Sequence, residues 1–264
     1  MTKTTRLPSP ARAAVNAAVH AAAEAPVLAV ISDVHANLPA LRAVCGELDR
    51  RRIAAVLCLG DVVGYGPHPA ACLRELRARG IPCLRGNHDD AAASGQLDAD
   101  LSPAAAAGIQ FARARLSRGE LQHLAGLPWA WEAGGATFVH ASLPRPEAFR
   151  YLMGPGEARR HLASQRAAVS FFGHTHVQGG FRRAGQGIVT LRPEDGGAVA
   201  QGAFNPGAVG QPRDGDPRAA FLVRDRRTGR VEFCRVAYDW QETAADVRRA
   251  GLPEELAQRL GEGW

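Results

Sequence analysis

The sequence predicts an α/β fold, and two observations carry that prediction. Short apolar runs of strand length alternate with amphipathic segments over residues 27–89, in the order strand, helix, strand, helix, strand. This order is typical of parallel strands joined by right-handed crossovers. Several of the apolar runs also end abruptly in Asp, Asn or His. Polar side chains at the carboxyl ends of buried strands lie where open α/β sheets bind their ligands, so the pattern predicts a site as well as a fold.

Length and cysteine content limit the class of protein. The 264 residues are enough for one large domain or two small ones with a real apolar core. No apolar run reaches the roughly 18 residues that a membrane-spanning helix needs. The five cysteines are odd in number and form no C-x-x-C pair, so we expect them to be reduced and buried in a cytoplasmic protein.

The net charge says little about partners. It is +6 and comes almost entirely from arginine, since Lys3 is the only lysine. The arginines are scattered and mixed with acidic residues, which disfavours a nucleic-acid-binding surface. We therefore expect neither a nucleic acid nor a membrane as a partner, and the sequence leaves the oligomeric state open.

Residues 1–26 form an N-terminal extension that is polar at first and rich in alanine from Ala11 to Ala25. The extension lacks the apolar stretch and cleavage pattern of a secretory signal. We expect a frayed helix or a disordered segment, with self-association as the alternative. Residues 27–264 are then the folded domain, because no internal repeat or linker divides them.

The first part of this domain is expected to hold three strands and two helices. Asn37 and Pro39 are suited to cap and open the first helix, and apolar residues follow at helical spacing. Pro69 opens the second helix and Gly80 closes it. The strands are predicted at 27–31, 53–59 and 81–84.

Helices dominate the next part of the chain. Residues 90–127 show helical patterns that start at Ser102 and Ser117, with packing positions at Phe111, Leu116, Leu121 and Leu124. A strand is then expected to reach residue 140, a helix to span 157–165, and a further strand to run from 169 to 174.

The last part is expected to be mostly antiparallel. Short strands with Gly and Pro turns are predicted between Phe181 and Tyr238, including a hairpin at Thr228-Gly229. The apolar alternation slips by one position between Phe233 and Cys234, which predicts a β-bulge. Two short helices are expected to finish the chain.

Five apolar runs deliver metal-ligand side chains at their ends. The D-x-H and H-x-H spacings place both side chains of each pair on one side of an extended segment. Carboxylates, imidazoles and one amide without any thiolate disfavour a structural zinc site and suit Mn²⁺, Fe or catalytic Zn²⁺. The candidate ligands are Asp33, His35, Asp61, Asn87, His140, His174 and His176.

Taken in order, the motifs D-x-H, G-D, G-N-H-D, V-H and G-H-T-H resemble those of the calcineurin-like metallophosphoesterase superfamily. The resemblance covers roughly residues 27–260 and implies an α/β four-layer sandwich of two mixed β-sheets flanked by helices. It also implies two divalent ions, with Mn²⁺ favoured and Fe, Zn²⁺ or Co²⁺ as alternatives. One ion would take Asp33, His35 and His176, the other Asn87, His140 and His174, with Asp61 bridging and His88 as the catalytic histidine beside the leaving group.

Two further features bear on the substrate. The segment 205–218 resembles a bacterial subgroup described as phosphodiesterases or diadenosine polyphosphate hydrolases. Protein phosphatases of the superfamily carry Asp and Arg where this chain has Gly64 and Tyr65, which argues against a phosphoprotein substrate. The candidates to bind phosphate or nucleoside instead are Tyr65, His68, Arg213 and Arg218.

The resulting hypothesis is metal-assisted hydrolysis of small phosphate diesters or anhydrides, with His88 acting as an imidazolium and Asp89 either orienting it or occupying a surface turn. A broad-specificity phosphomonoesterase or a nuclease of the same superfamily is the alternative. A non-catalytic scaffold is disfavoured, because all seven ligand positions and His88 are present.

Overall fold

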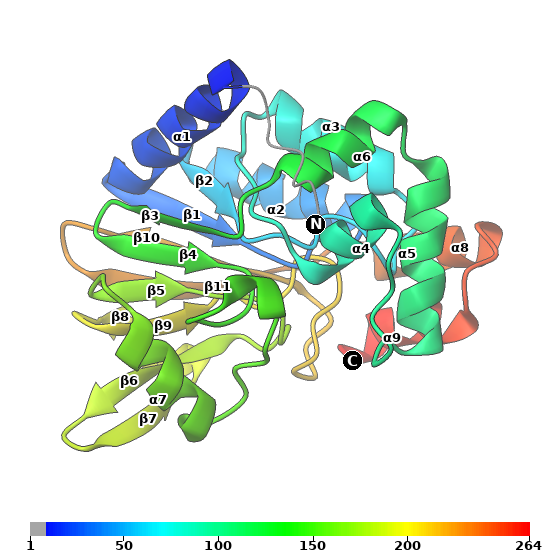
Figure 1. Ribbon diagram of the computed structural model, residues 1–264. Helices are drawn as coiled ribbons and strands as arrows, with labels where there is room; N and C mark the ends of the chain where they lie inside the picture. The colour runs from blue at the N-terminus through cyan, green and yellow to red at the C-terminus, as the bar shows by residue number, and fades with distance from the viewer. Residues whose placement is uncertain (1–8) are drawn as a thin grey trace.

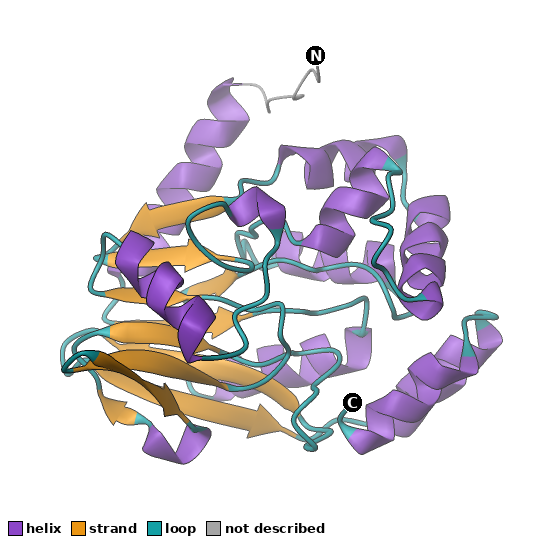
Figure 2. Cartoon of the chain, turned by 60° about the horizontal axis from the view of Figure 1, so that its bottom comes forward, coloured by secondary structure: helices purple, strands orange, loops and turns teal. Residues whose placement is uncertain are grey.

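The structure of the protein is a computed structural model that describes residues 9–264, with side chains from Val15 onward. Two β-sheets are stacked on each other, and helices cover their outer sides (Figure 1). Figure 2 shows the strands gathered in one part of the molecule, with helices around them and the C-terminus beside the loops at the strand ends. The predicted α/β sandwich of two mixed sheets is confirmed.

The first sheet has five strands in the order β2-β1-β10-β11-β8. β1 pairs in parallel with β2 and antiparallel with β10, so the sheet is mixed. The β10–β11 hairpin turns at Thr228-Gly229, as predicted. The strands are β1 (Val27–Ile31), β2 (Val56–Cys58), β8 (Gly197–Ala198), β10 (Ala219–Asp225) and β11 (Arg230–Val236).

The second sheet has six strands in the order β3-β4-β5-β9-β6-β7. β9 pairs in parallel with β5, which corrects the expectation of antiparallel pairing throughout this region. The chain passes through the first sheet at β8 before it returns, and this route lets β9 enter between β5 and β6. The strands are β3 (Ala130–Ala133), β4 (Ala136–Val139), β5 (Val169–Phe171), β6 (Gly179–Ala184), β7 (Gly187–Leu191) and β9 (Gly202–Asn205).

The helices begin where capping residues predict. The side chains of Asn37, Ser102 and Ser117 each accept a hydrogen bond from a backbone N–H in the first turn. The helices are α1 (Ser9–Glu24), α2 (Leu38–Arg50), α3 (Pro69–Ala78), α4 (Asn87–Ser94), α5 (Pro103–Arg115), α6 (Arg118–Gly126), α7 (Pro155–Ser164), α8 (Trp240–Arg249) and α9 (Glu254–Glu262), with short 3₁₀ helices at Pro146–Ala148 and Pro193–Asp195.

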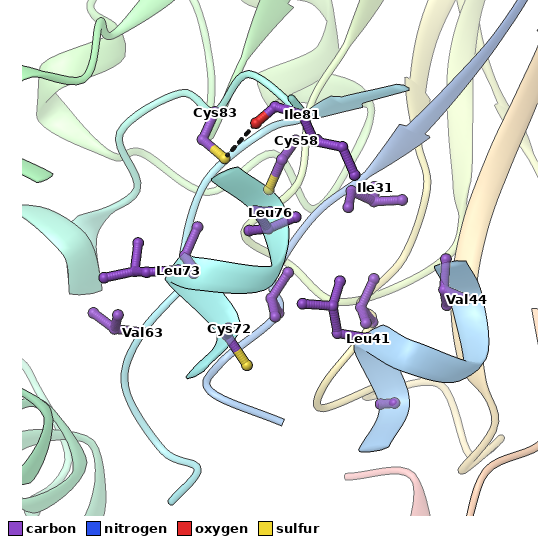
Figure 3. Close-up of a cluster of buried hydrophobic side chains, with 14 of the residues drawn as sticks. Ile31, Leu41, Val44, Cys58, Val63, Cys72, Leu73, Leu76, Ile81 and Cys83 are labelled. Atoms are coloured by element: carbon purple, nitrogen blue, oxygen red, sulfur yellow. Dashed lines mark hydrogen bonds between the residues drawn. The ribbon is translucent and has the colours of Figure 1, made fainter. Parts of the chain in front are cut away.

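Three apolar interfaces build the layers. α2 and α3 pack their buried side chains on one face of the first sheet, where Leu41 and Leu76 lie near Ile31 (Figure 3). The opposite face of that sheet packs against the second sheet through side chains such as Phe138 and Phe171. The outer face of the second sheet is covered by α7. These interfaces hold the strand ends in register, which fixes the loops that follow them.

The predicted strand 81–84 is reduced to one isolated bridge between Cys58 and Cys83. Pro82 has no N–H, so its only ladder contact is its carbonyl, which accepts from the N–H of Cys58 at 3.0 Å. The segment still follows β2 closely enough to deliver Asn87 beside Asp61.

The predicted β-bulge at Phe233 and Cys234 is wrong, because β10 and β11 pair one to one from Ala219 to Asp225. Apolar residues appear on both sides of β11 because both faces of the sheet are covered. Val231 and Phe233 pack between the two sheets, whereas Cys234 packs toward α2.

The N-terminal extension differs from the expectation in its described part. Ser9–Glu24 is a regular helix, and its Val19 and Ala23 are buried in the core between the sheets. Both side chains lie on one helical face, four residues apart, so the helix is docked rather than frayed. Residues 1–8 lie outside the described part.

The five cysteines are free and buried, as predicted. None of the described helices combines the length and the apolar character that crossing a membrane requires.

Candidate metal centre

The predicted ligands converge at the carboxyl ends of β1, β2, β4 and β5. Asp33 and His35 follow β1, and Asp61 follows β2. Asn87 opens α4, beside the loop that carries Asp61. His140 follows β4 directly, and the last two histidines follow β5. The six Asp and His ligands are almost wholly buried: Asp33, His35, Asp61, His140, His174 and His176.

Backbone strain is concentrated in these loops. Asp33, Asp61 and His174 adopt φ angles of 55°, 51° and 67°, and His35 and His176 adopt 47° and 60°. Residues other than glycine seldom adopt this left-handed region, and such strain persists where the surrounding structure enforces a functional geometry. The strand ends are therefore shaped to aim side chains inward.

The first group of ligands comes from the loops after β1 and β5. Asp33, His35 and His176 bring their donor atoms within 4.8 Å of one another. The Nε2 atoms of His35 and His176 are 3.0 Å apart, and Asp33 Oδ1 lies 3.4 Å from His176 Nε2. This group matches the set that the resemblance assigns to one metal ion.

The second group faces the first across Asp61. Asp61, His140 and His174 also lie within 4.8 Å of one another, and Asn87 Oδ1 is 3.3 Å from His140 Nε2. Asp61 Oδ2 lies 3.4 Å from His140 Nε2 and 3.7 Å from His35 Nε2. One carboxylate oxygen thus faces both groups, which is the arrangement a bridging ligand needs.

Hydrogen bonds to main-chain carbonyls fix the orientation of three histidines. Nδ1 of His35 donates to Val63 O at 3.2 Å, and Nδ1 of His140 donates to Leu59 O at 3.1 Å. Nδ1 of His176 donates to Gln211 O at 2.6 Å. A carbonyl only accepts, so Nδ1 carries a proton in each ring, and Nε2 is the nitrogen that faces the centre and offers its lone pair when the ring is neutral.

Two buried atoms support the fit to cations. Within the described residues, Asp33 Oδ1 and His174 Nε2 have no hydrogen-bond partner, and they belong to different groups. Buried polar atoms are normally satisfied. These acceptor atoms lack donors, and the Nε2 atoms of His35 and His176 are 3.0 Å apart. Together they form an environment that a pair of cations would satisfy.

Burial and neighbouring charges shift the pKa values of the candidate ligands in the protein without metal. Burial alone would raise the pKa of the Asp61 carboxyl, but His140 and His88 hold it well below its usual range. Burial alone would lower the pKa of His140, but Asp61 raises it to about 9, so without metal this ring also carries a proton on Nε2, which a bound cation would displace. Burial lowers the pKa of His174 to about 3, so this ring stays neutral and able to bind a cation.

His88 is buried next to the two groups. Its backbone N–H donates to Asp61 Oδ1 at 2.8 Å, which turns Oδ2 toward the groups. Its Nδ1 has no partner among the described residues and faces Gly64. Burial lowers the pKa of His88 to about 4, so the ring is neutral near pH 7.

Gly64 lies too close to His88 to carry a side chain. Its φ is +93°, and a Cβ at this position would lie 2.2 Å from His88 Nδ1. The Asp that protein phosphatases carry here, according to the resemblance, would displace the His88 ring. The departure seen in the sequence therefore has a structural consequence.

Asp89 neither orients His88 nor occupies a surface turn. Its carboxylate is fully buried and accepts from the N–H groups of Val62, Val63 and Gly86, at 3.0, 3.2 and 3.2 Å. Burial raises the pKa of Asp89 to about 7. The side chain ties the loop that carries Asp61 to the start of α4.

Two of the four substrate-binding candidates lie at the centre. The ring of Tyr65 packs 4.6 Å from the rings of both His35 and His88. Arg213 donates from a terminal guanidinium nitrogen to Tyr65 Oη at 2.9 Å, and its backbone N–H donates to His176 O at 3.1 Å. This pair lines the cleft in front of the ligands.

The structure does not bring the other two candidates to the cleft. His68 Nε2 lies 2.7 Å from Asp246 Oδ2, where it links α3 to α8. Arg218 is half exposed and pairs with Asp216 at 2.6 Å. Both side chains have the local structural roles that isolated polar residues usually have, and neither lines the cleft.

The cleft has a volume of about 340 Å³ and includes residues that the sequence did not single out. Tyr151 stacks on the His174 ring, with centroids 4.1 Å apart and an interplanar angle of 20°. Arg259 and Trp264 reach the cleft from the C-terminal end. No motif surrounds these three residues, so only their position in the fold reveals them.

The sequence of the chain is similar to a known protein family and to a protein from another organism. Residues 27–228 match the model of the calcineurin-like phosphoesterase superfamily domain. The uncharacterized protein MJ0912 of Methanocaldococcus jannaschii is 31% identical over 244 residues, which cover 89% of this chain and 97% of that protein.

The structure of this chain is also similar to solved structures of other proteins. The crystal structure of a metallophosphoesterase from Sphaerobacter thermophilus is 37% identical with a TM-score of 0.78, and the match covers 90% of this chain and 99% of that one. The hypothetical protein PH1004 from Pyrococcus horikoshii shares the fold at 19% identity, with a TM-score of 0.74 and coverage of 90% and 98%.

The fold and the His/Asp groups define a hydrolase of the binuclear-metal type, built on an α/β sandwich. The chain belongs to the calcineurin-like phosphoesterase superfamily. It is accordingly a metal-dependent phosphoesterase.

Proposed function

We propose that the protein hydrolyses small phosphate diesters or anhydrides, with nucleotides such as diadenosine polyphosphates among its substrates. The observation that carries this proposal is the cleft of about 340 Å³, which is lined by members of both ligand groups, by His88 and by the Tyr65–Arg213 pair. Small-molecule binding sites typically measure about 300–1,000 Å³, so the cleft has room for more than a phosphate group.

The ligand groups position the reacting phosphate. Asp33, His35 and His176 would hold one divalent ion and Asn87, His140 and His174 the other, with Asp61 between them. Two such ions, when bound, activate water and neutralise charge on the phosphoryl oxygens. Nitrogen and carboxylate donors without thiolate favour Mn²⁺, with Fe, Zn²⁺ or Co²⁺ as alternatives.

His88 acts on the leaving group in this proposal. Its Nδ1 is enclosed beside Gly64, so Nε2 is the ring nitrogen that can reach the cleft. The negative charge of a bound phosphate favours a proton on this ring. His88 then donates that proton, or a hydrogen bond from Nε2–H, to the departing oxygen.

Arg213 and Tyr65 bind the substrate beside the reacting group. Arg213 is fixed by Tyr65 Oη and by Gln211 Oε1, at 2.9 and 3.3 Å, so its planar fork is held in place before the substrate arrives. A preorganised guanidinium suits a phosphoryl oxygen. Gly64 and Tyr65 stand where the protein phosphatases carry Asp and Arg, and the absence of those two residues disfavours a phosphopeptide substrate.

A substrate screen tests the proposal directly. The purified protein, supplied in turn with Mn²⁺, Zn²⁺, Co²⁺ and Fe²⁺, is assayed with aryl phosphate mono- and diesters, cyclic nucleotides, dinucleoside polyphosphates and a phosphopeptide. We expect the highest kcat/KM with nucleotide diesters or anhydrides and Mn²⁺. Faster turnover of the phosphopeptide would refute the substrate class, and faster turnover of aryl monoesters would favour a broad phosphomonoesterase.

Replacing Arg213 tests the role of the pair. Loss of one hydrogen bond to a charged phosphate costs about 1.5–3 kcal/mol, so Arg213→Ala should lower the ratio of kcat/KM for a dinucleotide to that for an aryl phosphate by roughly 10- to 200-fold. Tyr65→Phe removes only the hydroxyl that holds Arg213 and should lower this ratio by about 2- to 12-fold.

Arg218→Ala is the matched control, because this arginine pairs with Asp216 and does not line the cleft. In this variant, the ratio of kcat/KM for a dinucleotide to that for an aryl phosphate should stay at the wild-type value. An unchanged ratio in Arg213→Ala would mean that this arginine does not select nucleotides.

The location of the protein is also part of the proposal. Five reduced, buried cysteines fit a reducing compartment such as the cytoplasm.

A further inference from the structure

The cleft extends beyond the metal centre to a wall formed by α9. Arg259 and Trp264 lie on this wall, and Asp100 lies on the loop before α5. Neither Arg259 nor Trp264 is near the metal ligands in the sequence. Both views place the C-terminus beside the loops at the strand ends (Figures 1 and 2).

Backbone contacts fix the end of α9. Gly263 has a φ of +70°, and its N–H donates to Arg259 O at 3.0 Å, which closes the helix. Its carbonyl accepts from the N–H of Gly215 at 3.1 Å. A Cβ at Gly263 would lie 2.7 Å from the backbone nitrogen of Asp216, so the two segments touch. Gly215 follows Arg213 by two residues, and α9 is thereby joined to the loop that carries Arg213.

The body of α9 is equally well anchored. Leu256, Ala257 and Leu260 are buried in a cluster that also contains Tyr65 and the start of α5. Arg259 therefore projects from a rigid element that packs directly on the Tyr65 side of the cleft. Sites on rigid elements hold their geometry better than sites on free loops.

Arg259 is free to bind an anion. Neighbouring arginines of the α8–α9 hairpin are paired, Arg248 with Glu254 and Arg249 with Asp246. Within the described residues, Arg259 makes no hydrogen bond or ion pair through its side chain, although it lines a cleft built for a phosphate. Among the described side chains that line the outer wall, Asp100 is the one carboxylate, so the side chains of Arg213 and Arg259 outnumber it there.

Exposed aromatic rings gather in the same place. Six large apolar side chains of the described residues are exposed, and two of them are aromatic, Tyr151 at 50% and Trp264 at 66%. Both aromatic side chains line this cleft. Exposed aromatic rings beside a cationic group are the surface on which nucleobases stack. This observation is independent of the arginine and points to the same class of ligand.

We propose that α9 provides a second subsite, in which Arg259 binds a phosphoryl group beyond the reacting one and Trp264 stacks on a nucleobase. The inference rests on the proposed nucleotide activity and assigns residues to the part of the substrate that lies beyond the reacting phosphoryl group. It assigns the polyphosphate chain to the interval between Arg213 and Arg259, and the base to the mouth of the cleft.

The test compares Arg259→Ala and Trp264→Ala with the wild type in the full-length protein supplied with Mn²⁺. Alanine preserves the helix at position 259. The ratio of kcat/KM for diadenosine tetraphosphate to that for an aryl phosphate should fall about 10- to 200-fold in Arg259→Ala. It should fall about 5- to 150-fold in Trp264→Ala. Arg248→Ala is the matched control on the same hairpin, and its ratio should not change.

Calorimetric binding of ADP separates this inference from the proposed function. The Kd of ADP should rise about tenfold or more in Arg259→Ala and stay unchanged in Arg248→Ala. If the wild type cleaves dinucleotides and Arg259→Ala keeps both its ratio and its Kd, the subsite is wrong and the proposed function stands. If the wild type cleaves only aryl esters, the proposed nucleotide activity fails, and a Kd that still depends on Arg259 would show that the subsite exists.

Discussion

Replacing Asp61 with alanine is expected to remove both metal ions and essentially all turnover. One oxygen of this carboxylate lies 3.4 Å from His140 Nε2 and 3.7 Å from His35 Nε2, so a single side chain serves both ligand groups. Without it, each group keeps neutral imidazoles but loses the shared negative charge that holds two cations close together. Metal content per chain, measured by mass spectrometry of the purified variant, and kcat/KM with an aryl phosphate check the prediction.

Asp61→Asn removes the negative charge of this side chain but keeps its shape. Its amide oxygen can still accept from the backbone N–H of His88, as Asp61 Oδ1 does at 2.8 Å, so the loop keeps its anchor while the charge is gone. We expect this variant to lose metal and turnover as well. Asp216→Ala removes a carboxylate that pairs with Arg218 outside the cleft, and it should retain both. An Asp61→Ala protein that still held two ions per chain would refute the binuclear assignment.

The convergence of the candidate metal ligands was predictable because these residues follow a simple rule of position. β1, β2, β4 and β5 are short apolar runs. β1 and β2 are parallel neighbours in the first sheet and β4 and β5 in the second, so each pair delivers its ends to one edge of its own sheet, and the two sheets are stacked. Polar residues placed directly after such runs therefore meet in space, and the sequence shows them. Capping residues such as Asn37 and Ser117 located the helices for the same reason, since their effect is local.

What the sequence did not reveal depends on long-range packing. His68 and Arg218 are polar residues in promising segments, but each finds a nearby acid instead of the cleft. Asp89 follows His88 directly, yet its carboxylate turns to backbone N–H groups of a loop 26 and 27 residues away. Arg259 and Trp264 reach the cleft only because α9 folds back onto Tyr65. No local pattern encodes such contacts.

Two predictions about strands, at residues 81–84 and in β11, were also wrong in part. Residues 81–84 are apolar and β-prone, but Pro82 removes one donor and leaves a single bridge to β2. Cys234 interrupts the alternation in β11 because the sheet is covered on both faces, which hides the period of two on which a register prediction depends.

Replacing His88 with alanine is expected to lower turnover by roughly 10²–10⁴-fold while the metal content holds. The backbone N–H that holds Asp61 is unchanged in this variant, and none of the seven proposed ligands is removed. The ring, with Nδ1 enclosed beside Gly64, is lost from the cleft. The loss should be smaller for p-nitrophenyl esters than for alkyl esters, because a good leaving group scarcely needs a proton. Metal analysis and kcat/KM for a leaving-group series provide the measurement.

His68→Ala is the matched control, since this histidine contacts Asp246 outside the cleft and should keep its turnover. Equal losses for good and poor leaving groups would rule out proton donation and leave His88 with a purely positioning role. Loss of a metal ion would have a different meaning. His88 also lies within 4.8 Å of the donor atoms of His35 and Asp61, so such a loss would identify the ring as a ligand rather than the acid.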